Sequence, residues 1–301
     1  MRARPDRRAL RRTGRSRVAL LLAGALTVVL AGCSAADGGG DPTSTATGSS
    51  SASPSGNGTA ADGATGDQFD GPAGSPPDPS IWTAQTGGGG WGNGEVQTYT
   101  SSAVALDGKG HLVITATAHG PASHPTYTSG RITTQHKLSW TTGTLSARMK
   151  LPDGTGLLPA FWLLGADVDS VGWPRAGEID IVETPNTTSR SSHTIHGPNK
   201  YLMSQDVPVS GDLQHDPKLS AGWHTYTVIR TADSITTKVD DTVAVHLTKA
   251  SAPPTLDWVF DQPMNILFSL AVGGKFPGNP DASTPRTSKM LIDWIAYSPR
   301  T

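Results

Sequence analysis

The stretch Gly177-Glu178-Ile179-Asp180-Ile181-Val182-Glu183-Thr184 carries two of the three glutamates in a chain of 301 residues. The third glutamate is Glu95, and the remaining 22 of the 25 acidic residues are aspartates. This chain rarely uses glutamate, yet it places two beside an aspartate in an apolar run. The pattern indicates that these positions need the longer side chain of glutamate. The alternative is a solvated polar face on an edge strand, where charged side chains are common.

The apolar residues of this stretch are β-branched, which favours a pleated strand over a helix. Successive side chains on a strand point to opposite faces, so Glu178 and Asp180 share one face. Glu183 lies five positions after Glu178 and would face the other way in a regular strand. A β-bulge around Ile181 and Val182 would return it to the shared face, and bulges are common beside active sites.

Three carboxylates on one face would repel one another and separate their pKa values. Such a separation lets one carboxyl stay protonated as an acid while another stays ionised as a nucleophile. The stretch therefore predicts acid and nucleophilic catalysis by carboxylates.

Further blocks of sequence accompany this one in a fixed order, namely 67–74 (DQFDGPAG), 90–97 (GWGNGEVQ), 129–132 (SGRI), 157–162 (LLPAFW), 195–198 (IHGP), 260–263 (FDQP), 271–274 (AVGG) and 291–294 (LIDW). Together with the G-E-I-D-I-x-E signature, they resemble the laminarinase-like branch of glycoside hydrolase family 16. The resemblance runs from about residue 67 to the end of the chain.

The resemblance implies a retaining, endo-acting hydrolase of β-1,3-glucan. It assigns Glu178 as nucleophile and Glu183 as general acid/base, with Asp180 between them as a hydrogen-bond partner of Glu178. Retaining glycosidases work through a covalent glycosyl-enzyme and need no cofactor for the reaction. The motif leaves open a related β-glucanase, galactanase or transglycosylase, and a non-catalytic carbohydrate-binding lipoprotein is a rival from another class.

Sugars present apolar faces and polar edges, so their grooves combine flat aromatic rings with planar polar groups. Positions in or flanking the family blocks predict the substrate-binding set Trp91, Asn93, Glu95, Arg131, Trp162, Trp173 and His196. For Glu95 an exposed loop carboxylate is an equal alternative, and His196 has a structural alternative. The other tryptophans are expected in the core, namely Trp82, Trp140, Trp223, Trp258 and Trp294. His193 and His196 are three apart, so on a strand they would not reach one metal ion together.

Several positions depart from the family pattern. Leu158 and Phe276 stand where tryptophans are usual, which predicts fewer stacking platforms for the glucan. Gly110 and Asp293 match two partners of a structural calcium in relatives, whereas Gln68 replaces the usual glutamate. Hard cations prefer charged oxygens, so a structural calcium at Gly110 and Asp293 is the weaker expectation.

The N-terminal region predicts export and lipidation. Eight arginines in the first seventeen residues precede an apolar run over 18–30, and the run ends at Leu30-Ala31-Gly32-Cys33, which resembles a bacterial lipobox. Cys33 is the single cysteine; its alternative is a buried thiol packed as a small hydrophobe. Residues 1–33 are predicted as a lipoprotein signal peptide and 34–66 as a disordered tether of small, mostly polar residues. The protein is expected on the outer face of the bacterial cell membrane, or secreted.

Removal of the leader takes 8 of the 24 basic and 1 of the 25 acidic residues, leaving 16 and 24. A net charge near −8 argues against nucleic acid as a partner, because such binding needs clustered Lys and Arg. A neutral substrate fits the balance better, and the resemblance implies that it is a β-glucan. The protein is expected to be a monomer.

Residues 67–301 are long enough for one catalytic domain, and their short alternating runs predict an all-β fold. Such runs occupy 111–116, 145–150 and 226–230, and a hairpin is predicted across 234–245. Many short strands indicate a two-sheet sandwich. The resemblance adds that the sandwich is a curved, concanavalin A-like jelly roll with a groove on its concave sheet.

Overall fold

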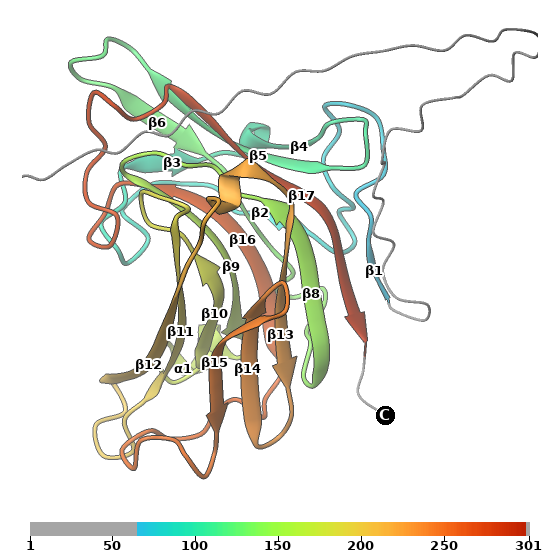
Figure 1. Ribbon diagram of the computed structural model, residues 1–301, viewed down its shortest axis with the longest axis vertical. Helices are drawn as coiled ribbons and strands as arrows, with labels where there is room; N and C mark the ends of the chain where they lie inside the picture. The colour runs from blue at the N-terminus through green and yellow to red at the C-terminus, as the bar shows by residue number, and fades with distance from the viewer. Residues whose placement is uncertain (1–64, 299–301) are drawn as a thin grey trace, which may run out of the picture. The chain divides into compact units, whose positions relative to one another are not determined.

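The computed structural model describes residues 65–298, and nearly all of its regular structure is β (Figure 1). The helical elements within this range are α1 (Val168–Val171), η1 (Ser101–Ala103) and η2 (Leu219–Ala221). Within the same range, no helix has the length and apolar character that crossing a bilayer requires. The predicted signal peptide, Cys33 and all of the tether up to residue 64 lie outside the described residues.

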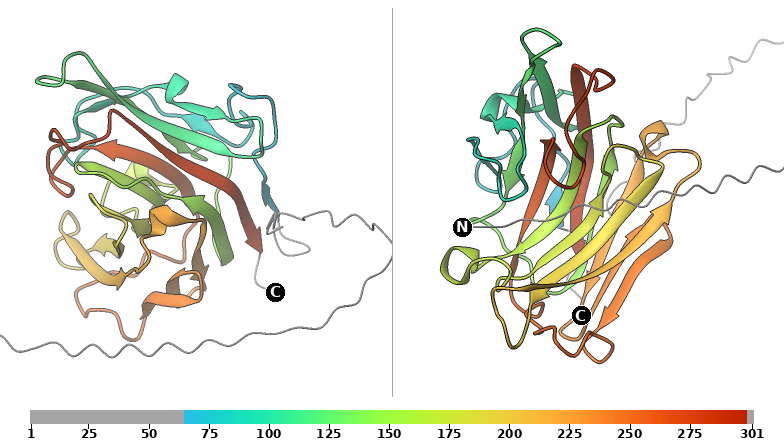
Figure 2. Two further views of the ribbon diagram at one scale, coloured as in Figure 1. Left: turned by 45° about the horizontal axis from the view of Figure 1, so that its top comes forward. Right: turned by 90° about the vertical axis from the view of Figure 1, so that its left-hand side faces the viewer.

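The strands form two sheets that pack face to face (Figures 1 and 2). The larger sheet has ten strands, in the order β15 (Thr242–Thr248), β14 (Ser234–Val239), β13 (His224–Arg230), β8 (Gly143–Lys150), β17 (Thr287–Ser298), β5 (Leu112–His119), β6 (Thr126–Ser129) and β3 (Gln97–Tyr99), with β1 (Thr65–Asp67) beside β17 and β4 (Val104–Leu106) beside β5. Among these pairs, β3 and β6 run parallel and the others antiparallel.

The smaller sheet has seven strands and is curved. Its order is β12 (Asp206–Gln214), β11 (Arg190–Pro198), β10 (Glu178–Glu183), β9 (Leu157–Gly165), β16 (Met264–Val272), β7 (Arg131–Thr133) and β2 (Thr83–Ala84). Neighbours along the sheet come from distant parts of the sequence, because β16 pairs with both β9 and β7. Residues near 130, 160, 180 and 270 are thereby brought onto one surface.

The all-β prediction is confirmed, together with its individual strands. The predicted runs fall within or across β5, β8 and β13, and the predicted hairpin forms β14 and β15 around a turn in which Asp240 has a φ of 50°. Strand β1 already includes Thr65 and Gly66, two residues before the expected start of the domain. These small residues join the sheet because backbone pairing with β17 needs no apolar side chain.

The core lies between the sheets and is built from the side chains on their inward faces. In β9, Phe161 and Leu163 point into the core, where Phe161 stacks on Phe268 with ring centroids 4.7 Å apart. Trp82 packs against the same Phe268 ring at 5.7 Å. The opposite faces of β9 and β16 are therefore free to line a surface groove.

The core assignment of the remaining tryptophans is right for two, and a third, Trp258, is half-buried but packs against the core. Trp82 and Trp140 are buried, whereas Trp223, Trp258 and Trp294 are only half-buried. Trp223 stacks on His111 with ring centroids 5.0 Å apart and lies under the guanidinium of Arg148. The ring of Trp223 thus contacts a polar and a cationic side chain instead of the apolar core. The sequence alone does not distinguish such a tryptophan from a core one.

Candidate active site

A bulge in β10 decides which way its carboxylates face. Asp180 pairs with Thr194 on β11 and Glu183 pairs with Ser192, so two residues of β10 stand opposite the single residue His193. The pairing of β10 with β9 shifts over the same positions. The predicted bulge is confirmed, and it restores Glu183 to the face of Glu178 and Asp180.

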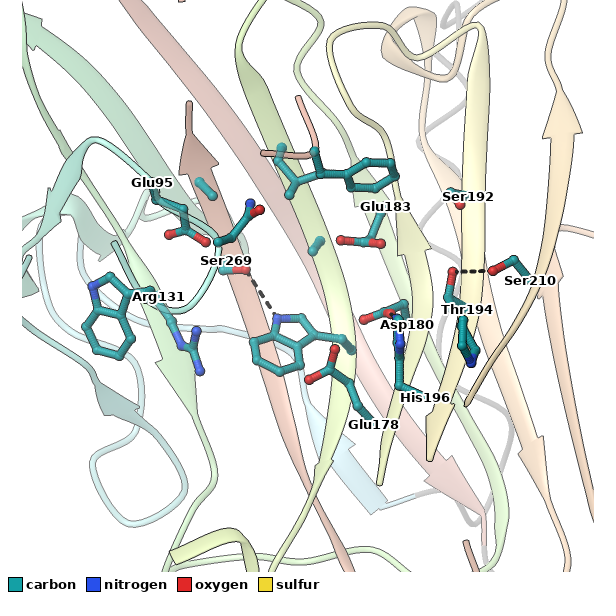
Figure 3. Close-up of a pocket in the computed structure, with 18 residues that line it drawn as sticks. Glu95, Arg131, Glu178, Asp180, Glu183, Ser192, Thr194, His196, Ser210 and Ser269 are labelled. Carbon is teal, nitrogen blue, oxygen red and sulfur yellow. Dashed lines mark hydrogen bonds and ion pairs between the residues drawn. The ribbon is translucent and has the colours of Figure 1, made fainter. Parts of the chain in front are cut away.

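The three carboxylates line an open groove of about 460 Å³ on the curved sheet (Figure 3). Alternate residues of β9, β11 and β16 complete the floor, while the loop before β3 and Phe276 contribute walls. In Figure 3, Glu178 and Glu183 reach into the groove from either side of Asp180. The groove therefore presents two separated carboxyls to anything bound along it.

Burial raises the pKa of all three carboxyls. For Glu183 the burial, together with the negative charges of Asp180 and Glu178, raises the pKa well above its usual range. Burial and Asp180 raise the pKa of Glu178 to about 8, while the positive charges of His196 and Arg131 counteract the rise. Glu178 is thus the easier of the two to ionise, and Glu183 keeps its proton longer.

His196 ties the central aspartate to a second one from the neighbouring strand. Its Nε2 lies 3.3 Å from Asp180 Oδ2, and its Nδ1 lies 2.6 Å from Asp206 Oδ2. Burial would lower the pKa of this imidazole, but its hydrogen bonds to the two aspartates raise it to about 10. His196 is therefore a cation that both aspartates share. Asp206 was not expected from the sequence, where nothing in its surroundings on β12 marks it.

Arg131 is clamped between two tryptophans on the other side of the groove. Its guanidinium lies 4.9 Å from the ring centroid of Trp91 and 4.6 Å from that of Trp162, and its Nε donates to Gln85 Oε1 at 2.5 Å. The Trp162 indole N–H reaches Ser269 Oγ at 3.2 Å. Both tryptophans and Arg131 line the groove as predicted, with Arg131 occupying one face of each ring.

Glu95 lies at the same end and is held by its neighbours. Its Oε2 accepts hydrogen bonds from Gln97 Nε2 at 2.5 Å and from the Tyr99 hydroxyl at 3.0 Å. Burial raises the pKa of Glu95, against the effect of these bonds. The structure thus places a supported groove carboxylate here and contradicts the alternative of an exposed loop residue.

Asn93 also lines the groove, and it anchors the loop that follows β16. Its Oδ1 accepts from the Lys275 backbone N–H at 3.1 Å. A Cβ at Gly274, whose φ is 103°, would come within 2.8 Å of Asn93 Nδ2. Glycine is required there because the backbone conformation is left-handed and the approach is close.

The remaining predicted positions fall near the groove but differ in their exposure. Trp173 is 51% exposed and its ring lies 6.0 Å from that of His196, although it does not line the central groove. Leu158 and Phe276, the two departures from the family pattern, both line the groove. These two departures therefore change the lining of the groove.

The two positions expected to bind calcium, Gly110 and Asp293, lie in different surroundings. Gly110 lies beside the loop 68–70, since a Cβ there would be 3.6 Å from Asp70 Oδ1. The Asp293 carboxylate, however, is paired with the guanidinium of Arg148. The positive charge of Arg148 would oppose a divalent ion at Asp293, and the structural calcium stays a prediction.

The one carboxylate and histidine cluster with metal-like spacing within 65–298 is Glu178, Asp180 and His196, in the groove itself. Its imidazole already contacts two aspartates through both nitrogens, which occupies the lone pair that a metal would need. His193 points into the core, where it is fully buried, so the two histidines do not share one ion. That prediction is confirmed.

Paired glutamates flanking an aspartate in an open groove of a curved β-sandwich define a carboxylate-dependent glycosidase. The chain belongs to glycosyl hydrolases family 16, whose family model matches residues 92–296. It is therefore a glycoside hydrolase.

Similar proteins agree with this assignment. A beta-glucanase of Rhodothermus marinus is 34% identical over 236 residues, which cover 73% of this chain and 79% of that protein. The laminarinase catalytic domain of Thermotoga maritima has a TM-score of 0.70 at 34% identity, covering 79% of this chain and 97% of that one. The endo-β-1,3-glucanase of Pyrococcus furiosus has a TM-score of 0.69 at 36% identity, covering 78% and 94%.

Proposed function

We propose that the protein is a retaining endo-β-1,3-glucanase. The observation that carries the proposal is the bulged β10, which turns Glu183 onto the same groove face as Glu178. The similarity to laminarinases supports β-1,3-glucan as the substrate. An open groove accepts the interior of a chain, which supports endo action over removal of terminal sugars.

In the first step a carboxylate oxygen of Glu178 attacks the anomeric carbon, and the bond to the departing oxygen breaks as Glu183 gives that oxygen its proton. In the second step water attacks the same carbon, Glu183 takes the water proton, and Glu178 leaves with its electron pair. Two inversions at one carbon retain its configuration. The order of the two pKa values matches these roles, because Glu178 must be ionised while Glu183 is protonated.

The proposal is tested by incubating the purified enzyme with laminarin and following the new reducing ends. We expect internal cleavage to short oligosaccharides, with the β-anomer appearing first in a proton NMR time course. Release of the α-anomer first would contradict a retaining mechanism. Absence of reducing ends from laminarin would contradict the assignment of the linkage.

The same assay on mixed-linkage glucan and agarose separates the related activities that the motif leaves open. Preferential cleavage of mixed-linkage glucan or of agarose would change the assigned substrate but not the retaining mechanism. Transfer products at high oligosaccharide concentration would indicate a transglycosylase. Binding without turnover by the parent protein would favour the carbohydrate-binding alternative.

Lipid attachment at Cys33 is proposed on the sequence pattern around that residue. Two acyl chains on the mature N-terminus would hold the enzyme at the outer face of the cell membrane, with the predicted tether as a spacer. Fractionation of cells that express the full chain should recover it with membranes, and Cys33→Ser should release it. Equal membrane association of both would contradict lipidation. A monomer is proposed as well, and light scattering of the enzyme without its leader tests it.

A further inference from the structure

The residue opposite the bulge carries a buried imidazole that the reaction scheme does not use. His193 lies on β11 between Thr194 and Ser192, which pair with the two ends of the bulge. Its side chain points away from the groove into the core and is fully buried. Its Nδ1 lies 2.5 Å from the backbone carbonyl oxygen of Ile181, one of the two bulged residues.

The hydrogen bonds around this imidazole have one consistent direction. The Ile181 carbonyl only accepts, so His193 Nδ1 must carry the proton. Burial lowers the pKa of His193 to about 4, so the ring is neutral and its Nε2 accepts from Ser191 Oγ at 2.8 Å. Ser191 Oγ in turn lies 2.8 Å from His215 Nε2, which must donate to it. A chain of three donors thus ends on the bulge carbonyl.

The bulge creates the need for such a donor. Ile181 has no pairing partner on either neighbouring strand, so its carbonyl loses the regular ladder contact. Ile181 and Val182 are fully buried and lie among apolar side chains. A buried carbonyl without a partner costs about 1–3 kcal/mol. A regular strand would satisfy this carbonyl in the ladder but would turn Glu183 away from the groove.

We infer that His193 is a positioning residue for catalysis, whose Nδ1–H donor selects the bulged form of β10 and thereby aims Glu183 into the groove. This rests on the proposed function, in which Glu183 transfers the proton. His193 touches neither substrate nor carboxylate, since Ser192 and Thr194, its neighbours on the strand, are the ones that face the groove (Figure 3). An apolar side chain would fill the same space without supplying the donor.

Two substitutions separate the donor from the packing. His193→Leu removes the donor and keeps an apolar side chain in the core. His193→Asn places an amide N–H at the same number of bonds from Cα as Nδ1, so it retains the bond to Ile181. Thr237→Val, at a buried threonine of β14 in the other sheet, is the control for loss of a buried polar group.

We expect His193→Leu to lower kcat on laminarin by about 10- to 100-fold, the effect of a reactive group displaced by about 1 Å. KM should change little, because the groove residues that bind the glucan remain. His193→Asn should recover most of the lost kcat, and Thr237→Val should keep the parent kcat. A parent-like kcat for His193→Leu would overturn the inference, and so would an Asn variant as slow as the Leu variant at equal melting temperature.

A second measurement decides the inference without any turnover. The chain has three glutamates, so selective ¹³C-carboxyl labelling yields three signals, two from the bulged strand and one from Glu95. We expect His193→Leu to shift the titration of Glu183 toward the usual range of a carboxyl, while Glu95 keeps its titration as an internal control. Unchanged titration of Glu183 would overturn the positioning role. If the parent enzyme cleaves no β-glucan, the proposed function fails, while these titrations still report whether His193 places Glu183.

Discussion

The two faces of β11 hold two histidines, three residues apart, in opposite states. His196 faces the groove, where two aspartates outweigh its burial and raise its pKa to about 10. His193 faces the core, where burial lowers its pKa to about 4 and a backbone carbonyl is its acceptor. One ring is a cation among carboxylates and the other is a neutral donor among apolar side chains. The two residues are of the same type, so the difference in charge comes from the face of the strand on which each imidazole lies.

The same difference divides the whole smaller sheet. Its groove face holds the three carboxylates of β10 and Arg131, whereas its core face is mostly apolar. Substituting residues on one face at a time therefore separates the effect of charge in the groove from the effect of packing in the core. The expected effects below run from the largest to the smallest.

Glu178→Gln should remove the nucleophile from the groove face while leaving the core face intact. Activity on laminarin should fall by about ten-thousand-fold, the scale of loss when a covalent catalyst is removed. Glucan binding, measured by calorimetry, and the melting temperature should stay close to those of the parent. Unchanged hydrolysis would refute the assignment of Glu178.

His196→Gln should break the charge balance of the groove, because Asp180 and Asp206 would lose their shared cation. We expect kcat to fall by about 100-fold and the free energy of unfolding to fall by about 3 kcal/mol at pH 6. The folded state holds the proton of the His196 imidazole more tightly than the unfolded state does, because folding raises the pKa of this group. The contribution of His196 is therefore complete below its ordinary pKa of 6.5 and is lost as the pH rises through about 10.

Denaturation curves of the parent and of His196→Gln at pH 6, 8 and 10 measure this dependence. The stability difference between the two proteins should narrow as the pH increases. A difference that stays constant from pH 6 to pH 10 would show that His196 acts through its packing and not through its charge. The matched His193→Asn variant should show no such narrowing over this interval, because its parent residue is neutral throughout.

Asp180→Asn should shift the pH dependence of the reaction. Burial is the largest cause of the raised pKa values of Glu178 and Glu183, and the negative charge of Asp180 is the second largest. Removing it should move both limbs of the kcat/KM profile to lower pH, by about one unit. The alkaline limb reports loss of the Glu183 proton and is the clearer readout. A profile lower in height but unmoved along the pH axis would contradict the coupling.

Trp173→Ala should have the smallest effect, because this ring lies beyond the central groove, with its centroid 6.0 Å from that of His196. We expect KM for long laminarin chains to rise by about threefold to tenfold, equivalent to one aromatic contact. A short aryl glycoside should be hydrolysed at the parent rate. An equal loss on both substrates would place the effect at the catalytic centre instead.

The strands and the convergence of the three carboxylates on one face were predictable because their signals are local. β-branched residues with period-two alternation identify the strands, and the odd spacing of Glu178 and Glu183 requires the bulge. Asp206 was not predictable, since its partnership with His196 depends on the pairing of Pro198 with Asp206 across β11 and β12. The burial of Trp223, Trp258 and Trp294 was overestimated. For Trp223 the reason is that a tryptophan covered by a histidine and an arginine looks the same in sequence as one in a core.

The amino-acid sequence by itself determined the alternation of faces, the bulge and the identity of the groups that can transfer protons. These follow from residue spacing along one strand, which short-range sterics control. The tertiary structure alone decided which groups are charged and what each one contacts. It placed Arg131 between Trp91 and Trp162, put His196 between two aspartates and buried His193 beneath the carbonyl of Ile181. Charge and contact depend on burial and on neighbours from distant strands, and both exist only once the sheets have paired and closed on each other.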